Sequence, residues 1–552
     1  MSDFKPTAEI SERHVEERRP KFFGRLLKAE PERALLDGLA HMNETVLDPV
    51  VVKRIERRVD LLVIPALAVC YMFYYIDKTT LSYAAIFGIK EDLALGKMEY
   101  VRVSISYRLT RLMQKAPTAM VIEYLLLCVR TFSIFVRTPI GFPVGWLFWA
   151  FPTNLLMQKF PIAKYLAVNI FFWGVLLMAQ AAAKDFKDMM ILRILSGAAE
   201  STADPAFVLI TGLWYTRSQQ PIRIGLWYSA NGIGIALGGL LGYAIGHIKG
   251  ALPSWRYEFL IIGALCSFWA LVMFTFVPDS PYYTSYWFKD EERLIVLSRK
   301  RHDQAGADTH RVKPGQIVEA FCDPKIYLFF LLGFSSNIPN GGISNFGTFI
   351  IQGFGFDTLE TALMQIPYGF FICFCILFSV WVNNKAPKNS RTLLMIVFLL
   401  PNIIGSCMMA WGPETSKPTR LIGYWLTGSY NATFVLGLSL VSGNVGGQTK
   451  RAVANAAVFL GLCTGNIVGP FLFKTSEAPK YTTGIVGMLV ANIVEVFVIL
   501  ALRILFLTSN KRRDRKMTEE GVKYDERPAM MDDITDFENP VFRYVAVGSF
   551  LF

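Results

Sequence analysis

The chain has 552 residues, of which 53% are hydrophobic and only 18% charged, and its mean hydropathy is +0.37. A composition this apolar excludes a soluble globular protein of this length and predicts a membrane protein. The net charge of +12 would suit nucleic acid, but the basic residues fall in short clusters between apolar runs. Membrane topology explains such clusters, so we expect no nucleic-acid partner.

Apolar runs of about 20 residues, each long enough to cross roughly 30 Å of hydrocarbon as a helix, follow one another along the chain. They predict an all-α membrane protein with twelve spans, at 61–87, 141–157, 165–183, 189–215, 222–247, 257–277, 326–352, 359–382, 392–411, 420–442, 452–473 and 484–507. The expected organisation is an N-terminal region (1–59), a six-helix half (60–278), a central loop (279–325), a second six-helix half (326–507) and a tail (508–552).

The positions of Lys and Arg indicate the orientation of the chain. A basic cluster at 53–58 precedes the first span, basic residues recur after every second span, and a cluster at 511–516 follows the last one. Cytoplasmic loops carry an excess of Lys and Arg. We therefore expect both termini and the central loop to be cytoplasmic.

One segment, 101–140, breaks this pattern. It would lie outside the cell, yet it holds six basic residues against a single acid, Glu123. The stretch from the start of each half to the turn after its second span is also about 40 residues longer in the first half than in the second, although parallel repeats should match. The segment is either an extracellular insertion or translated non-coding sequence such as an unremoved intron, and sequencing the mature transcript would decide between them.

Two adjacent charges, Asp77 and Lys78, come about 17 residues into the first span. Ionised side chains inside a membrane are costly and mark functional sites by default. The alternative is that the span ends at Tyr75 and the pair lies at the interface, but the apolar pattern continues beyond the pair. One helical face would then carry Tyr71, Tyr75, Lys78 and Ser82.

The fourth span carries Arg193, Gly197 and Glu200 on one helical face, and Asp204 continues it. Burial raises the pKa of an acid and a neighbouring cation lowers it again. A carboxylate whose cationic neighbour is taken by an anionic substrate therefore suits proton coupling. The alternative is a salt bridge that only orients the helix.

Amides are the other polar candidates. Asn231 begins the glycine-rich stretch of the fifth span, and we attribute the glycines there to close helix packing. The second half has many amides, among them Asn337, Gln365 and Asn455, of which most are expected to cap or bridge helices. Glu495 in the last span is either another coupling acid or a structural residue, and its place near the end of the fold favours the structural role.

Motifs for chemistry are missing from the sequence. It has no P-loop, no GxSxG and no HExxH pattern, its five histidines form no cluster, and its eight cysteines show no CxxC spacing. We expect no enzyme activity, no cofactor, no metal and no disulfide framework.

Several stretches together resemble the major facilitator superfamily, and within it the anion:cation symporter family and its fungal allantoate permease group. These stretches are "YIDKTTLSYAAIFGIKEDL" (75–93), "WAFPTNLLMQKFPIAKYL" (149–166), "RILSGAAES" (193–201), "FVPDSP" (276–281), "GGQTKR" (446–451), "GNIVGP" (465–470) and "ENPVFRY" (538–544). The resemblance implies a major facilitator fold of two six-helix bundles. Segment 101–140 departs from the family's pattern.

By similarity to bacterial galactonate carriers of the same family, the resemblance implies residue roles. Asp77 and Glu200 match proton-handling acids, and Lys78 and Arg193 match their basic partners. Tyr75 and Asn231 fall where those carriers contact substrate. We add Asn337, Gln365 and Asn455 as candidate substrate contacts.

The sequence therefore predicts a monomeric, proton-coupled transporter that imports a small organic anion across a fungal plasma membrane, with allantoate or ureidosuccinate preferred. Nicotinate, pantothenate, biotin, cysteine or a small peptide remain open as substrates. Two rivals also remain: a nutrient sensor that lost transport, and an inactive mis-spliced product.

Overall fold

The computed structural model describes residues 49–93, 153, 156–157, 160–216, 219–281, 287–303, 313–386, 390–413, 416–520, 534–539 and 542–544. The described residues fold into α-helices and two short 3-10 helices, joined by turns and loops. Segment 101–140 and all but three residues of the predicted second span, 141–157, lie outside this description. The insertion and the non-coding reading of 101–140 therefore both stay open.

The first half of the chain supplies six long helices and one short one. They are α2 (Pro49–Ile86), α3 (Ile89–Asp92), α7 (Ile162–Gln180), α8 (Phe186–Glu200), α9 (Ala203–Trp214), α10 (Gln220–Gly246) and α11 (Ser254–Phe276). Two helices follow in the central region, α12 (Asp290–Asp303) and α13 (Pro314–Cys322).

The second half begins with α14 and ends with α21, the longest helix described. Its α-helices are α14 (Pro324–Gly353), α15 (Thr358–Leu363), α16 (Gln365–Lys385), α17 (Arg391–Trp411), α18 (Lys417–Leu426), α19 (Tyr430–Asn444), α20 (Gln448–Phe471) and α21 (Thr482–Glu520). The 3-10 helix η3 (Thr427–Ser429) joins α18 to α19, and η4 (Thr475–Glu477) precedes α21.

Eight helical segments of the described chain are long and apolar enough to cross a membrane. The other predicted spans in the described chain fall on the polar-interrupted helix α14 and on two pairs of shorter helices, α8 with α9 and α18 with α19. The predicted span 189–215 is thus not one continuous helix. Pro205 has no N–H to bond the carbonyl of Ser201, which explains a break at this point, and Asp204 lies in the first turn of α9.

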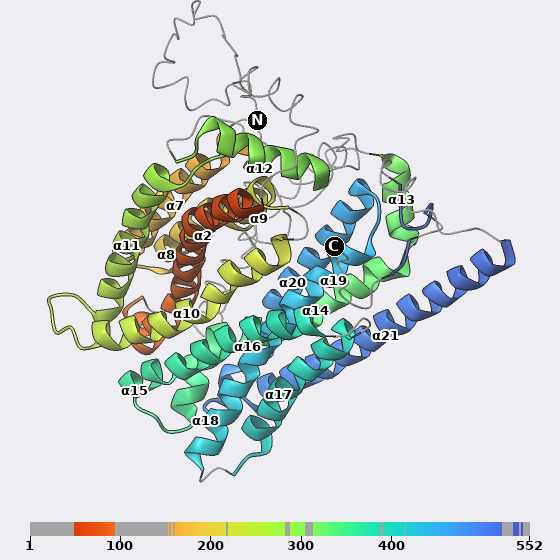
Figure 1. Cartoon of the computed structure of the whole chain (residues 1–552). Coiled ribbons are helices and arrows are strands. Elements are labelled where there is room, and N and C mark those ends of the chain that lie inside the picture. Colours follow the sequence, from red (N-terminus) through yellow and green to blue (C-terminus); the bar gives the residue numbers. More distant parts are fainter. Residues whose placement is uncertain are drawn as a thin grey trace, which may run out of the picture.

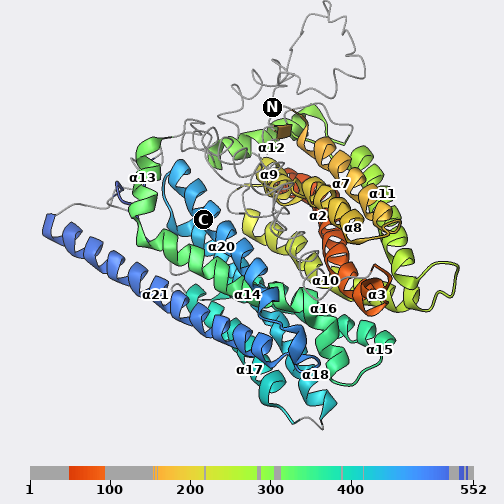
Figure 2. The same ribbon diagram turned by 180° about the vertical axis from the view of Figure 1, so that it is seen from behind.

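The helices form two bundles that follow the order of the chain (Figures 1 and 2). Helices α2 to α11, coloured red to yellow-green, make one bundle, in which α7 packs against α11 and α2 against α10. Helices α14 to α21, coloured green to blue, make the other, in which α14 packs against α20 and α17 against α21. This is the expected pair of helix bundles. We call the end of the molecule that holds α12 and α13 the central-loop end.

The two bundles meet where α10 packs against α16 and α2 against α14. Gly232 of α10 and Gly369 of α16 allow backbone contact, because a Cβ on Gly232 would lie 2.2 Å from the Gly369 oxygen. Farther from the central-loop end, Ser82 Oγ donates to the Ser344 carbonyl at 2.7 Å. Thr348 Oγ1 donates to the Ser82 carbonyl at 3.3 Å. Backbone groups thus join the bundles at the end opposite the central loop.

The C-terminal tail returns to the fold at the central-loop end. Helix α21 continues to Glu520, beyond the predicted span end at 507, and residues 534–539 and 542–544 then lie beside α13 (Figure 1). Asp536 is fully buried there, where it pairs with Lys325 and, at 2.8 Å, with Lys450. The tail is therefore a packed part of the second bundle.

Candidate functional site

A buried ion pair lies in the first bundle. Arg193 Nη1 of α8 lies 3.3 Å from Asp77 Oδ1 of α2, and both side chains are 1% exposed. Trp173 Nε1 of α7 donates to the other Asp77 oxygen at 3.0 Å. Asp77 thus accepts donors from two neighbouring helices, as a buried carboxylate requires. The predicted polar face of the fourth span reaches across to the first span.

Lys78 faces the second bundle instead. Its Nζ donates to Asn340 Oδ1 of α14 at 2.9 Å and lies 4.7 Å from the centre of the Tyr75 ring. Tyr430 of α19 and Ser344 of α14 donate to the same Asn340 oxygen, at 3.0 and 3.2 Å. Asn340 therefore joins the cation of one bundle to hydroxyl groups of the other.

A small cavity lies between the bundles, and its lining includes Tyr75, whose ring lies under Lys78, with Ser344 and Tyr430, which share the Lys78 partner Asn340. Gln365 of α16 reaches it, and Gln365 Nε2 donates to the Tyr424 hydroxyl at 2.9 Å. Most of its lining is aromatic or hydroxyl-bearing: Tyr75, Thr79, Ser82, Tyr83, Ile235, Ile343, Ser344, Thr348, Gln365, Tyr368, Tyr424 and Tyr430. Such a lining, with a few polar groups that converge, is typical of small-molecule sites.

An aromatic cluster borders the cavity on its first-bundle side. Tyr71 stacks on Tyr74 with ring centroids 5.5 Å apart and lies 5.3 Å from the Tyr75 ring. Trp227 meets Tyr71 edge-on at 5.2 Å. Rigid rings fix the position of Tyr75, and hence of the cation that lies over it.

Four predicted site residues remain, and one of them lies between the bundles. Asn231 lies between the bundles, where its Nδ2 donates to Asn431 Oδ1 at 3.0 Å. Glu200 is buried at the end of α8, with 7% of its surface exposed. Asn337 is bonded within the second bundle, because it accepts from Asn340 and Asn466. Asn455 is half-buried on α20 and does not line the cavity.

Several residues around Asp77 and Lys78 were assigned no particular role from the sequence. Asn340 was one amide among many, and Tyr430 and Trp173 had no signal beyond their type. Glu258, in α11, is completely buried near Arg193. A charged residue within a predicted span was the available signal for Glu258, but it lies close to the span's start, where charges are common.

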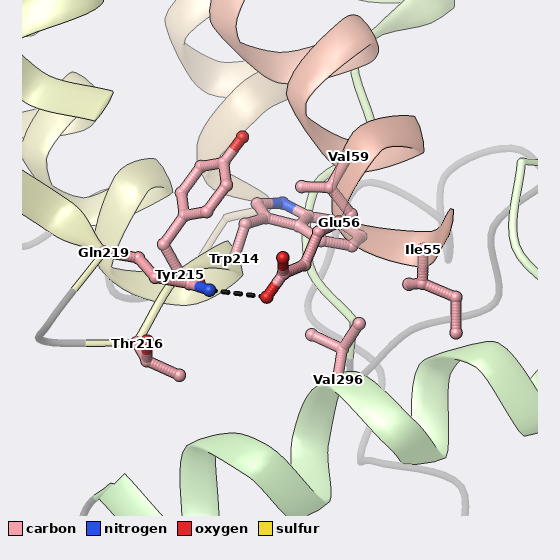
Figure 3. Close-up of a pocket in the computed structure, with 8 residues that line it drawn as sticks. All are labelled: Ile55, Glu56, Val59, Trp214, Tyr215, Thr216, Gln219 and Val296. Atoms are coloured by element: carbon pink, nitrogen blue, oxygen red, sulfur yellow. Dashed lines mark hydrogen bonds between the residues drawn. The ribbon is translucent and has the colours of Figure 1, made fainter. Parts of the chain in front are cut away.

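A second pocket lies away from these charges, at the central-loop end of the first bundle (Figure 3). In it, Gln219 Nε2 donates to Glu56 Oε1 at 2.5 Å. Its lining is Ile55, Glu56, Val59, Trp214, Tyr215, Thr216, Gln219 and Val296. This crevice joins the start of α2 to the turn between α9 and α10, and it holds none of the predicted site residues.

Two apolar helix bundles around a polar centre define a multi-pass membrane transporter. The model of the Major Facilitator Superfamily matches residues 67–470, and the chain belongs to this family. Its members are transporters of small molecules rather than enzymes.

Curated relatives agree with this assignment. The chain is 34% identical to an uncharacterized transporter of Schizosaccharomyces pombe over 498 residues, which cover 89% of this chain and 87% of the relative. It is 31% identical to the allantoate permease of Saccharomyces cerevisiae, with 89% and 86% covered. It is 30% identical to a thiamine pathway transporter of the same yeast, with 89% and 86% covered.

Solved structures support the fold alone. A bacterial homolog of the human lysosomal transporter Spinster, in an inward-facing and occupied conformation, matches with a TM-score of 0.51 and 14% identity. The match covers 80% of this chain and 96% of the bacterial one.

Proposed function

We propose that this protein is a proton-coupled symporter that imports a small organic anion, preferably allantoate or ureidosuccinate, across a fungal plasma membrane with both termini in the cytoplasm. Lys78 binds the anion, together with Tyr75, Asn231 and Gln365. Asp77 and Glu200 handle the driving proton. The likeness to an allantoate permease supports the choice of substrate.

The observation that carries the proposal is the position of Lys78 between the bundles. Its ammonium group donates to a neutral amide, Asn340 Oδ1, beside the small cavity between the bundles. A carboxylate accepts a stronger, charge-assisted hydrogen bond than an amide does. An anion in the cavity would therefore replace Asn340 as the acceptor and loosen one link between the two bundles.

The second part of the proposal concerns the proton. Asp77 neighbours Lys78 in sequence and forms an ion pair with Arg193. Protonation of Asp77 would end that pair and leave the guanidinium for another partner. Because binding and protonation then act on adjacent groups of α2, anion and proton occupancy are coupled.

Uptake of labelled allantoate in permease-deficient yeast, at acidic and neutral pH, tests the proposal. We expect acid-stimulated accumulation that a protonophore abolishes. The chain is expressed both as written and with 101–140 trimmed, and activity of the trimmed form alone would identify the segment as foreign. Absence of allantoate uptake by both forms at the plasma membrane would refute the substrate assignment.

Competition separates the candidate substrates. Excess unlabelled ureidosuccinate should block allantoate uptake, whereas thiamine, a cation, should not. The thiamine arm is included because one relative is named for the thiamine pathway. Block by thiamine and not by ureidosuccinate would contradict the anion assignment.

A further inference from the structure

Glu258 of α11 is a buried acid that the proposed mechanism does not use. Its side chain is completely buried, and neither of its carboxylate oxygens has a hydrogen-bond partner among the residues that the structure describes. A polar group buried without a partner is costly, and an ionised carboxylate far more so. An acid inside a membrane-spanning bundle is therefore a candidate for a functional role.

The neighbours of Glu258 are the groups of the buried ion pair. Glu258 interacts electrostatically with Arg193 and Asp77. The Arg193 guanidinium also lies 5.4 Å from the ring centre of Phe259, the next residue of α11. The Arg193 guanidinium thus pairs with Asp77 and also interacts electrostatically with Glu258, so the three groups together are neutral when one of the two acids holds a proton.

The surrounding helices carry a few other charged groups. Lys78 of α2 donates to Asn340 of the other bundle, and Asp92 of α3 accepts from Trp255, three residues before Glu258. Tyr83 of α2 is close enough to Glu258 to interact with its charge. Within their helical ranges, α7 and α10 carry their charged residues, Lys164 and Arg223, near the central-loop end, far along the helix from this cluster. Arg193 is therefore the cation that both acids share in the described part of this region.

The acids are staggered along the bundle. Glu258 is the fifth residue of α11, which begins at the end opposite the central loop, and Arg193 lies in the middle of α8. Glu200 follows Arg193 by seven residues, about 10 Å of helix rise toward the central-loop end. From the opposite end inward, the order is therefore Glu258, then Arg193 with Asp77, then Glu200.

We propose that Glu258 is a third proton-carrying residue of transport and the outermost one, which exchanges its proton with Asp77 while Arg193 changes partner. In this step the O–H bond of Glu258 breaks and one forms on Asp77. The charge stays balanced, because the Glu258 carboxylate then pairs with the Arg193 guanidinium. This inference rests on the proton coupling proposed above.

Transport by Glu258→Gln tests the assignment. The variant should exchange allantoate between the two sides of the membrane at a rate within about twofold of wild type. Its accumulation under an imposed acid-outside gradient should be at least tenfold lower than that of wild type. Glu258→Asp, which retains the acid, should recover part of it. Glu495→Gln is the matched control, since it makes the same change at a completely buried acid of the other bundle, and should leave the pH profile unchanged. Accumulation by Glu258→Gln with the wild-type pH profile would overturn the proposal.

Labelling of the unaltered protein provides a measurement that depends neither on folding of a variant nor on the substrate. A hydrophobic carbodiimide reacts with protonated carboxyl groups in apolar surroundings, and peptide mapping locates the adduct. We expect an adduct on Glu258 that diminishes as pH rises. Adducts on Asp77 or Glu200 without one on Glu258 would contradict the proposal. If wild-type accumulation is insensitive to the protonophore, symport fails and the transport role of Glu258 fails with it. Protonophore-sensitive accumulation without an adduct on Glu258 would refute the assignment of Glu258 alone.

Discussion

The Lys78 ammonium group lies one residue from a buried ion pair, yet it donates to an amide of the opposite bundle. Asp77 and Lys78 therefore serve different partners, although they are adjacent in sequence. Because consecutive residues of a helix point about 100° apart, one residue faces its own bundle and the next faces the other. At the residue scale, this separation of roles is the feature that transport variants can test.

Replacement of Lys78 by Ala should remove anion binding. A hydrogen bond to a charged group contributes about 1.5–3 kcal/mol, so we expect a loss of affinity of roughly 10- to 150-fold. The measurement is the concentration dependence of allantoate uptake, corrected for surface abundance. Lys249→Ala, at an exposed lysine, is the control. An unchanged half-saturation concentration in the Lys78 variant would exclude Lys78 from the binding site.

Glu200→Gln should separate exchange from accumulation. The amide keeps the shape and burial of the side chain but carries no transferable proton, so exchange of labelled for unlabelled substrate should continue. Accumulation driven by a pH gradient should fall to background. Asp188→Asn, at an exposed acid of the same helix, should behave as wild type. Wild-type accumulation by the Glu200 variant would end its assignment as a coupling residue.

At the element scale, the contact between α14 and α20 depends on the absence of side chains. A Cβ on Gly461 would lie 2.0 Å from the Phe330 carbonyl oxygen and 2.8 Å from the Phe334 nitrogen. Both atoms belong to the backbone of α14 and cannot move as a side chain would. Small residues at helix contacts are the means by which membrane helices approach closely.

Gly461→Ala should therefore destabilise the second bundle. Overpacking of this kind costs about 1–3 kcal/mol, which should appear as a lower melting temperature of the purified protein in detergent. Gly212→Ala in α9 is the matched control, because outside its own helix backbone no atom of the described residues lies within 4 Å of its added Cβ. A melting temperature equal to that of the control would show that the two helices are not packed as described.

At the scale of the whole molecule, the two bundles repeat one contact at the central-loop end. In the first, Arg223 near the start of α10 pairs with Asp60 of α2 at 3.2 Å. In the second, Lys450 near the start of α20 pairs at 2.8 Å with Asp323, just before α14. The second bundle adds Asp536 of the tail to this pair. The tail is thus attached at an ion pair that has a counterpart at the same end of the first bundle.

Asp536→Asn should detach this tail. Removal of one partner of a buried pair costs about 3–5 kcal/mol, so the melting temperature at neutral pH should fall clearly. Asp514→Asn is the control, since its partner Arg543 and Asp514 itself are partly exposed and such pairs contribute little. Equal melting temperatures of the two variants would show that the tail adds no stability.

The contribution of Asp536 should also depend on pH. Burial alone would raise the pKa of its carboxyl, but the charge and hydrogen bonds of Lys325, with hydrogen bonds of Lys450 and Tyr544, hold that pKa below its ordinary value of 3.8. A lowered pKa gives stability that is complete above the unfolded value and is lost as pH falls through the folded one. The difference in melting temperature between wild type and Asp536→Asn should therefore stay constant down to about pH 5 and shrink below 3.8. A difference that grows with acid would contradict this.

The sequence by itself determined the class of the protein and most of its spans. Lipid offers no hydrogen-bond partners to backbone groups, so a spanning chain must satisfy them within a helix or a closed barrel. Apolar runs of sufficient length therefore predict helices directly. The apolar runs of the second half all fall on helices of the structure, and Asp77 and Lys78 could be singled out because charge inside such a run is rare. The break before α9 could also be read from Pro205, but the sequence analysis treated 189–215 as one span.

Only the tertiary structure decided the partners. Sequence reasoning placed Arg193 on a face with Glu200, whereas the structure pairs it with Asp77, 116 residues earlier. It left Asn340 among several equal amides and gave Glu258 and the tail residue Asp536 no role. Helical periodicity relates residues within about one or two turns, whereas these contacts join different helices, so their formation depends on how the helices pack.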